Sequence, residues 1–358
     1  MNNSTNIASR ENNLNIIRFI AAIMVIYGHM YPIMGQCSYT IMNQAVSTIG
    51  VEIFFVISGY LITTSFLNEK SVFCYGVKRF FRIIPGLLAV CLVSVFVIGP
   101  LVSDYSIKVY FTEHLGEALE YMKNVVLYPI YSLPGVFIDN VYPNTVNGSL
   151  WTLPIEAALY IIVPLIIVIT GKKRGYKYGL TISLFIILVF NTIKLTSYPQ
   201  ARLVIWGSDI MQAMNLVPYF FIGAIFTFDK IKRLLNIQVG TLLFFITIML
   251  NMSYAKTQVL MVFVLPYFIF SLAFASKPVF SKFGTKIDLS YGIYLYGFII
   301  QQILVKYLSE NRLSVNVMFI ISTLLSMLCA VVSWYLVEKP MQKLGKIIVK
   351  KYKAKTEA

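Results

Sequence analysis

Apolar residues are grouped along the chain in ten long runs that are separated by polar segments. A helix needs roughly 20 predominantly apolar residues to cross the hydrocarbon core of a bilayer, and the runs are close to that length. The pattern therefore predicts an all-α, polytopic integral membrane protein with about ten transmembrane helices. The predicted spans cover residues 14–34, 46–67, 83–103, 149–169, 178–196, 209–228, 238–254, 257–276, 289–309 and 316–338.

Composition agrees with this pattern, because 58% of the residues are hydrophobic and only 13% are charged. In soluble domains about a quarter of the residues are charged. Between the third and fourth spans, Glu113, Glu117 and Glu120 recur at helical spacing. They predict an amphipathic or re-entrant helix over 112–130 that does not cross the membrane. We expect one membrane-embedded domain over 1–345, followed by a basic cytoplasmic tail over 346–358.

The distribution of positive charge predicts the orientation. Most of the 30 lysines and arginines lie on alternate loops that share one side with both ends of the chain. Cytoplasmic loops accumulate these residues, so both termini are predicted to be cytoplasmic. The same asymmetry accounts for the net charge of +15 without a nucleic-acid partner, and the basic tail favours contact with anionic membrane lipids. The four scattered cysteines predict neither a disulfide framework nor a metal site.

Two polar residues interrupt the first apolar run, Arg18 and His29. They are eleven residues apart, which on a helix places them within about 20° of one face and separates them by about 16 Å. Ionisable residues inside a membrane are costly and usually mark a substrate path. We interpret the pair as a cation at the cytoplasmic mouth of a path and an imidazole deeper in the membrane. The alternative is a histidine satisfied by a neighbouring hydroxyl and an arginine that only anchors the topology.

Two carboxylates also fall within predicted spans, Glu52 and Glu156. A buried glutamate needs a cation, a hydrogen-bond donor or a proton. Either residue is a candidate to orient His29 and stabilise its charge, as the third member of a catalytic triad does.

The segment KRFFRIIPG forms a basic cluster on the cytoplasmic side, with Lys78, Arg79 and Arg82. Arg79 and Arg82 are three residues apart and share a helical face. Guanidinium groups at this spacing suit a diphosphate, which they bind through paired charge-assisted hydrogen bonds. The preference of cytoplasmic loops for arginine explains the cluster equally well.

Six segments occur in order along nearly the whole chain: NIIRFIAAIMVIYGH, VEIFFVISGYL, KRFFRIIP, SLWTLPIEAALY, SYGIYLYGFI and VSWYLVEKPM. Together they resemble the membrane acyltransferase-3 family, which includes bacterial O-antigen, exopolysaccharide and peptidoglycan O-acetyltransferases. The resemblance implies a ten-helix core that takes an acyl group, usually acetyl from cytoplasmic acetyl-CoA, to a hydroxyl that is commonly on a sugar. One departure is Gly297, where many members carry a histidine.

The resemblance also implies roles for matching residues. His29 corresponds to the catalytic histidine and Glu156 to the acid of the W-x-L-x-x-E motif, while Arg18, Arg79 and Arg82 correspond to the arginines of the first helix and of the coenzyme end. We therefore expect an acyltransferase of the bacterial plasma (inner) membrane, with acyl-CoA, a sugar acceptor and lipids as partners and no metal. A transporter or flippase for a lipid-linked sugar or small solute is the alternative. The expected catalytic residues are His29, Glu156 and Glu52, and the expected donor-binding residues are Arg18, Arg79, Arg82 and Lys78.

Overall fold

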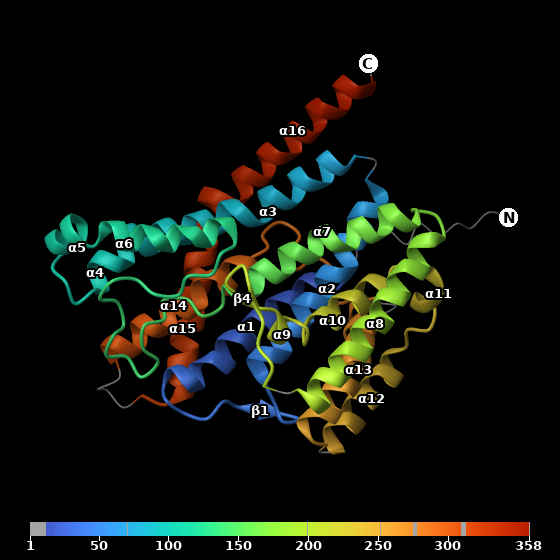
Figure 1. Cartoon of the computed structure of the whole chain (residues 1–358), viewed down its shortest axis with the longest axis horizontal. Coiled ribbons are helices and arrows are strands. Elements are labelled where there is room, and N and C mark those ends of the chain that lie inside the picture. The colour runs from blue at the N-terminus through green and yellow to red at the C-terminus, as the bar shows by residue number, and fades with distance from the viewer. Residues whose placement is uncertain are drawn as a thin grey trace.

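The computed structural model describes residues 12–69, 71–198, 200–250, 252–274, 278–308 and 313–357, and this part of the chain is mostly helical (Figure 1). Its α-helices are α1 (Leu14–Ile33), α2 (Val46–Asn68), α3 (Val72–Val93), α4 (Gly99–Val102), α5 (Ile107–Glu113), α6 (Leu115–Glu120), α7 (Thr152–Thr170), α8 (Gly175–Ser197), α9 (Ile210–Ala213), α10 (Val217–Ile225), α11 (Asp229–Lys232), α12 (Ile237–Met249), α13 (Tyr254–Ala273), α14 (Ser290–Leu308), α15 (Val315–Ser333) and α16 (Lys339–Glu357). The π-helical turns are η1 (Ser94–Ile98) and η4 (Trp334–Glu338), and η2 (Tyr121–Val126) is a 3₁₀ helix. Two short antiparallel hairpins pair β1 (Thr40–Ile41) with β2 (Gln44–Ala45) and β3 (Val204–Ile205) with β4 (Ser208–Asp209).

Seven helices of the described chain are long and apolar enough to cross a membrane. This confirms a helical, multi-pass membrane protein. These helices are Leu14–Ile33, Val46–Asn68, Val72–Val102, Thr152–Thr170, Gly175–Ser197, Tyr254–Ala273 and Val315–Thr356.

Three of the ten predicted spans are not among these seven helices. The predicted span 209–228 is interrupted between α9 and α10, where Pro218 stands in the first turn of α10. The 13 residues of α12 reach only about 20 Å, less than the roughly 30 Å of a hydrocarbon core. In α14, buried Gln301 and Gln302 make the helix less apolar. The count of ten and the cytoplasmic location of both termini therefore remain predictions.

The segment between the third and fourth predicted spans differs from the single helix expected over 112–130. It contains α5, α6 and η2, with a break at His114 and an end at Leu127, whose φ of 62° is left-handed. None of these pieces approaches the length of a spanning helix. From Leu127 to Leu150 the chain then runs without regular helix alongside α14, where Asn147 donates to the Leu295 carbonyl at 2.8 Å.

Glycines allow α2 to lie at the centre of the bundle, where it is the most buried of the spanning helices (Figure 1). A Cβ atom at Gly59 of α2 would come within 1.9 Å of the Phe220 carbonyl oxygen on α10, and one at Gly223 of α10 within 2.0 Å of the Val56 carbonyl oxygen. Small residues at such crossings let membrane helices pack backbone against backbone. This contact fixes the neighbouring Ser58 against the site described below.

The chain is one continuous helix from Val315 to Thr356, through α15, η4 and α16. Its final part packs alongside α3 (Figure 1). Gly345 lies against the ring of Phe81, and the rings of Phe73 and Tyr352 are 4.7 Å apart. The basic tail predicted at 346–358 is thus helical over its described residues and is held against α3 by aromatic contacts.

Candidate active site

A cavity of about 90 Å³ lies between α1, α2, α3, α7 and α14. A water molecule occupies at least about 10–15 Å³ on this kind of measure, so the cavity accommodates several waters or the end of a larger ligand. Its polar walls carry four of the predicted site residues, together with hydroxyl groups. These residues are Arg18, Arg79, Arg82, Glu156, Ser58, Thr152, Tyr160, Ser290, Tyr291 and Tyr294.

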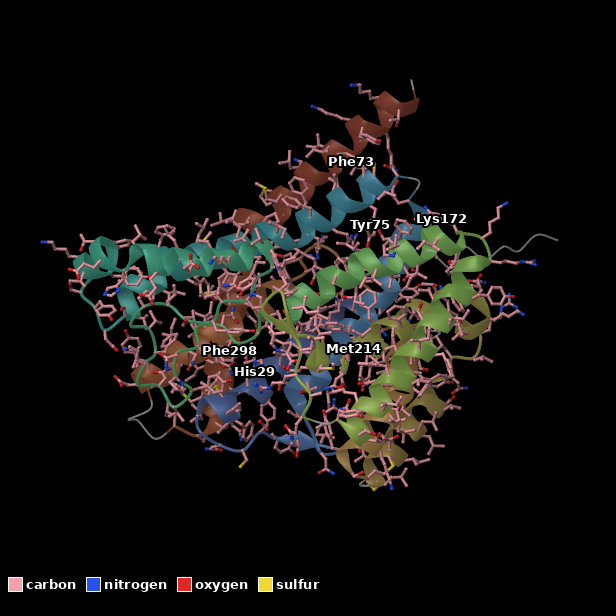
Figure 2. The ribbon with its side chains drawn as sticks, in the orientation of Figure 1. His29, Phe73, Tyr75, Lys172, Met214 and Phe298 are labelled. Atoms are coloured by element: carbon pink, nitrogen blue, oxygen red, sulfur yellow. The ribbon has the colours of Figure 1, made fainter. Side chains whose placement is uncertain are left out.

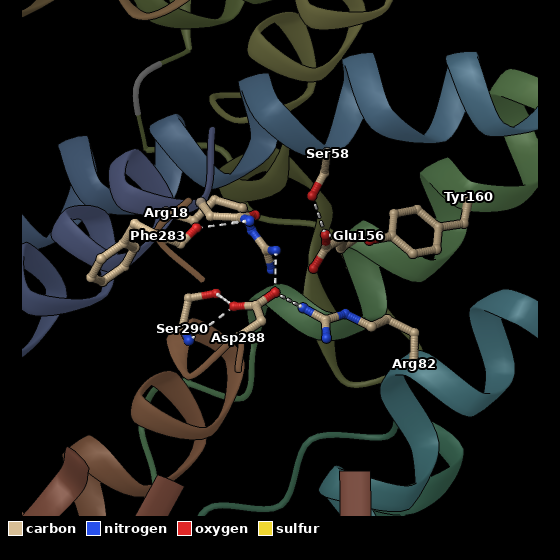
Figure 3. A network of polar contacts seen from close by, with 9 residues as sticks. Arg18, Ser58, Arg82, Glu156, Tyr160, Phe283, Asp288 and Ser290 are labelled. Atoms are coloured by element: carbon tan, nitrogen blue, oxygen red, sulfur yellow. Dashed lines mark hydrogen bonds and ion pairs between the residues drawn. The ribbon is translucent and has the colours of Figure 1, made fainter. Parts of the chain in front are cut away.

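Two of the arginines are held by one carboxylate, that of Asp288, just before α14 (Figure 3). Its Oδ2 accepts from Arg18 Nη1 at 2.7 Å and from Arg82 Nη2 at 2.6 Å. Its Oδ1 accepts from the backbone N–H of Ser290 at 3.2 Å and from the Ser290 hydroxyl at 2.7 Å, which caps α14. Burial would raise the pKa of Asp288, but Arg18 and Arg82 hold it well below its ordinary range. The carboxylate is therefore charged and joins α1, α3 and α14.

Glu156 of α7 faces the same cavity (Figure 3). Its Oε1 accepts two short hydrogen bonds, from the Ser58 hydroxyl and from the Tyr160 hydroxyl, both at 2.6 Å. Two donors on one oxygen leave the other carboxylate oxygen available to the cavity. Sequence analysis singled out Glu156, and the structure adds the hydroxyls that hold it.

Arg79 differs from the other two arginines because it forms no ion pair within the described chain. Its guanidinium carbon lies 5.9 Å from the centre of the Tyr75 ring, and its Nε is buried without a hydrogen-bond partner. A buried donor without a partner is costly. Together with its place in the cavity wall, this identifies Arg79 as the guanidinium most able to accept an anionic ligand.

His29 lies outside this cavity, farther along α1. Its ring packs edge-on against Phe298 of α14, with centroids 5.3 Å apart (Figure 2). One turn earlier on α14, Tyr294 lines the cavity, so Tyr294 and Phe298 separate the arginines from the imidazole. Gln301 fixes the two helices at this level by donating to the Ile26 carbonyl at 2.7 Å. Among the described residues, no carboxylate or hydroxyl is hydrogen-bonded to the imidazole.

Glu52 also lies away from the cavity. It is fully buried on α2, where one carboxylate oxygen accepts from the Gln44 amide and the other finds no partner among the described residues. Tyr219 of α10 is fully buried and interacts electrostatically with this carboxylate. The predicted pairing of Glu52 or Glu156 with His29 is not present in this arrangement, and their catalytic roles remain predictions.

Lys78 points away from the cavity as well. It pairs with Glu69 in the turn between α2 and α3, at 2.5 Å, and Lys353 of α16 pairs with the other oxygen of Glu69 at 2.8 Å. Lys172 donates to the backbone carbonyl of Glu69 at 2.6 Å. The structure thus separates Lys78 from Arg79, its neighbour in sequence, and assigns Lys78 to a contact that holds α16 against the α2–α3 turn.

Glu69→Gln should lower stability in a pH-dependent way. Burial opposes ionisation of this carboxyl, but Lys353 and Lys78 lower its pKa to about 2. An ordinary glutamate has a pKa of about 4.3, so the stabilising contribution is complete above about pH 4.3 and is lost as the pH falls through about 2. The difference in unfolding free energy between wild type and variant, measured in detergent, should shrink by about half between about pH 6 and about pH 3. An exposed control, Glu113→Gln, should show no such trend, and a constant difference for Glu69→Gln would contradict the assignment.

Two acids that interact with the arginines of the cavity were not predicted from the sequence. In the sequence, Asp288 is only a polar residue that precedes an apolar run. Its arginine partners, Arg18 and Arg82, are 270 and 206 residues away, so the sequence does not connect them. Glu338 lies in the π-helical turn η4, is almost fully buried, and interacts electrostatically with Arg82. In the sequence, its segment VSWYLVEKPM contributes to the resemblance to the family but does not indicate a role for Glu338. π-Helical turns are frequent at functional sites, but sequence alone does not reveal them.

The fold and the cavity together define a class, a multi-pass membrane protein with a buried cavity lined by arginines. The chain belongs to the acyltransferase-3 family, because that family's acyltransferase domain matches residues 11–337. It is similar to the O-acetyl transferase of Shigella phage Sf6, at 26% identity over 92% of this chain and 96% of the relative. It is also similar to nodulation protein 10 of Rhizobium leguminosarum bv. viciae, at 26% identity over 96% of each chain. No solved structure matches the chain significantly.

Membership in this family establishes the protein as an acyltransferase. It decides against the transporter or flippase that the sequence alone left open. The resemblance recognised from six short segments is confirmed across nearly the whole chain.

Proposed function

We propose that the protein is an O-acetyltransferase of a bacterial plasma (inner) membrane, which moves an acetyl group from cytoplasmic acetyl-CoA to a hydroxyl of a cell-surface or lipid-linked sugar. The phage relative is named an O-acetyl transferase, which supports the acyl group and the acceptor atom. The observation that carries the donor assignment is the convergence of three guanidinium groups on one cavity. An acyl-CoA is the acyl donor whose phosphates match such a site.

The charges of the cavity favour a polyanionic ligand. Arg18 and Arg82 share a single carboxylate, while Arg79 has no ion-pair partner among the described residues. Guanidinium groups present planar, paired N–H donors that match phosphate oxygens. In this proposal Arg79 and Arg82 bind coenzyme phosphates, and Arg18 lies beside Arg82 at the shared carboxylate of Asp288. The cavity is too small for a whole coenzyme, so its nucleotide remains toward the cytoplasm.

The proposed chemistry takes place at His29. A neutral imidazole, with a reference pKa of about 6.5, accepts the proton of the acceptor hydroxyl as its oxygen attacks the thioester carbonyl. The carbon–sulfur bond breaks, and the coenzyme thiolate leaves and regains a proton from the imidazolium. If the acetyl group is first transferred to His29 as a transient acyl-histidine and then to the hydroxyl, the overall reaction is the same. The thioester reaches His29 along α14, so the rings of Tyr294 and Phe298 must move aside when the donor is bound.

Radiolabelled acetyl-CoA tests the proposal directly. Purified protein in lipid vesicles is incubated with the labelled donor and a surface polysaccharide or a lipid-linked sugar, and label is followed into the acceptor. Release of free coenzyme thiol together with recovery of the label as an O-acetyl ester supports the proposal. Donor and acceptor that both remain unchanged with a full panel of sugars would refute it.

Arg79→Ala should weaken the binding of acetyl-CoA by about 1.5–3 kcal/mol, the scale of a hydrogen bond to a charged group. Arg79→Lys should restore only part of this loss, because lysine lacks the planar fork. The measurement is the dissociation constant for acetyl-CoA in detergent. A matched control is Arg174→Ala, which removes an exposed arginine from the loop between α7 and α8 and should leave the affinity unchanged. If Arg79→Ala and Arg174→Ala bound acetyl-CoA with equal affinity, Arg79 would contribute to membrane topology and not to donor binding.

A further inference from the structure

A second hollow, of about 560 Å³, lies on another face of α7. On this helix Leu153, Glu156 and Tyr160 face the cavity described above, whereas Ala157 and Ala158 face the second hollow. At 100° per residue, the residues of α7 that line the second hollow lie on roughly the opposite side of the helix from those that line the cavity. We call the second hollow the α7 groove. Its other walls are α8, the β3–β4 hairpin and the α9–α10 segment.

The α7 groove is almost entirely apolar and opens to the outside of the helical bundle. Ile161 on its wall is 70% exposed, and Trp206 of the hairpin is 61% exposed. Met214 contributes to the wall from the α9–α10 segment (Figure 2). In a membrane such a surface contacts hydrocarbon. A volume of about 560 Å³ lies within the range of sites that bind small molecules, about 300–1,000 Å³, so the groove has room for one chain and not for a large glycan.

The wall of the groove carries a polar group that lacks a partner. The hydroxyl of Ser208 lines the groove, is buried, and finds no hydrogen-bond partner among the described residues. Asn191, four residues after the groove residue Ile187 on α8, is also buried, and its Oδ1 finds no partner among the described residues. Buried polar atoms are normally paired, so an unpaired hydroxyl in the wall of an apolar groove indicates a ligand with a polar end.

A buried cation lies next to the groove wall. Lys194 of α8 is 7% exposed, and its ammonium group donates to Asn215 Oδ1 at 2.7 Å. Asn215 directly follows Met214 of the groove wall. The neighbouring carboxylate of Asp209 interacts electrostatically with Lys194, but it also caps α9 and lies 4.0 Å from Arg202. Within the described chain Lys194 has no ion-pair partner at 4 Å or less, and a buried ammonium of this kind is stabilised by an anion.

We propose that the α7 groove binds the hydrocarbon chain of a single-chain lipid phosphate, with the phosphate near Lys194 and the hydroxyl of Ser208. This rests on the proposed function and deepens it, because such a lipid is the form in which a lipid-linked sugar acceptor reaches the enzyme. The apolar walls bind the chain, the buried ammonium selects the phosphate, and α7 connects the groove to Glu156 on its other face. The acceptor sugar is thereby delivered beside the helix that lines the donor cavity.

Farnesyl phosphate is the probe that tests this assignment, with farnesol as the same chain without phosphate. Binding is measured on the full chain purified in detergent. Lys194→Gln should weaken the binding of farnesyl phosphate about tenfold or more, the effect of losing one hydrogen bond to a charged group, and should not affect farnesol. Ala158→Phe should weaken both by filling the groove. Matched controls are Lys108→Gln, which removes an exposed lysine, and Val168→Phe, which enlarges an exposed residue of α7 outside the groove.

Several results would overturn the proposal. The first is that wild type binds farnesyl phosphate and farnesol with equal affinity. The second is that Lys194→Gln and Ala158→Phe bind farnesyl phosphate as wild type does. The third is that an equal concentration of phosphatidylglycerol displaces farnesyl phosphate, which would make the groove a site for bulk lipid. The proposed function is tested separately by acetyl transfer. If Ala158→Phe no longer binds farnesyl phosphate but still transfers acetyl to a soluble sugar, both the groove assignment and the proposed function are supported. Binding of farnesyl phosphate without any acetyl transfer would refute the proposed function and leave the groove assignment intact.

Discussion

A His29→Gln variant is expected to insert and fold like the wild type but to lose at least about 10²–10⁴-fold of its acetyl-transfer rate, the range that general acid–base catalysis supplies. Glutamine is close in size to histidine and keeps a group that donates and accepts hydrogen bonds. It cannot take up a proton near neutral pH. A structural role at this position, such as packing against Phe298, would survive the change, whereas proton transfer would not.

The measurement is acetyl transfer in membranes that contain matched amounts of each variant. His114→Gln is the natural control, because His114 is the other histidine of the chain and its ring stacks on Tyr105, with centroids 4.0 Å apart. It should retain wild-type activity. Phe298→Ala adds a second comparison, since it removes the contact to the imidazole without removing the base. Transfer by His29→Gln at a rate close to that of wild type would end the catalytic assignment.

The first helix illustrates how far the sequence predicts the site. Spacing alone placed Arg18 and His29 on one face of a helix, with the histidine farther along the axis. The structure has Arg18 in the cavity wall and His29 beyond it, behind Phe298. Periodicity fixes which residues share a face, but it does not identify what a neighbouring helix places against that face. For this reason the aromatic separation between the two residues was not predictable.

The basic cluster shows a second limit. Lys78 and Arg79 are adjacent in sequence and about 100° apart around α3, so they point in different directions. Only the packing of α16 decides that Lys78 pairs with Glu69 while Arg79 faces the cavity. The positive charge of the tail at 346–358 predicts a cytoplasmic segment but does not predict that it is helical. Contacts between elements that are far apart in the chain leave no periodic signal.

The spans were predictable where a run was long and uniformly apolar. The span at 209–228 was less predictable because the helix is interrupted before Pro218. At 289–309 the helix is continuous, but a pair of buried glutamines makes it less apolar. Buried glutamines such as Gln301 are tolerated because they form hydrogen bonds within the protein, here to the backbone of α1. Hydropathy does not distinguish a polar residue that is satisfied in this way from one that ends a span.

The largest loss of stability is expected for Asp288→Ala. The carboxylate of Asp288 is the shared ion-pair partner of Arg18 and Arg82, and removing one member of a buried ion pair typically costs about 3–5 kcal/mol because a charge is left without compensation. Asp288→Asn should cost nearly as much. An asparagine keeps an oxygen for the N–H of Ser290 at the start of α14, so this variant removes the charge and leaves the helix cap.

Unfolding free energies of detergent-purified variants measure this effect, with Asp104→Asn as the control. Asp104 also forms an ion pair, with Lys306 at 2.8 Å, but its side chain is 44% exposed, and exposed pairs contribute only about 0–1 kcal/mol. The arginines lower the pKa of Asp288, so its contribution is present above the ordinary aspartate pKa of about 3.9 and is lost only as the pH falls below it. The difference between wild type and Asp288→Asn should therefore be the same at about pH 5 and about pH 7. If Asp288→Asn were no more destabilising than Asp104→Asn, the two arginines would not depend on this carboxylate, and the anion that compensates them would have to come from the bound donor.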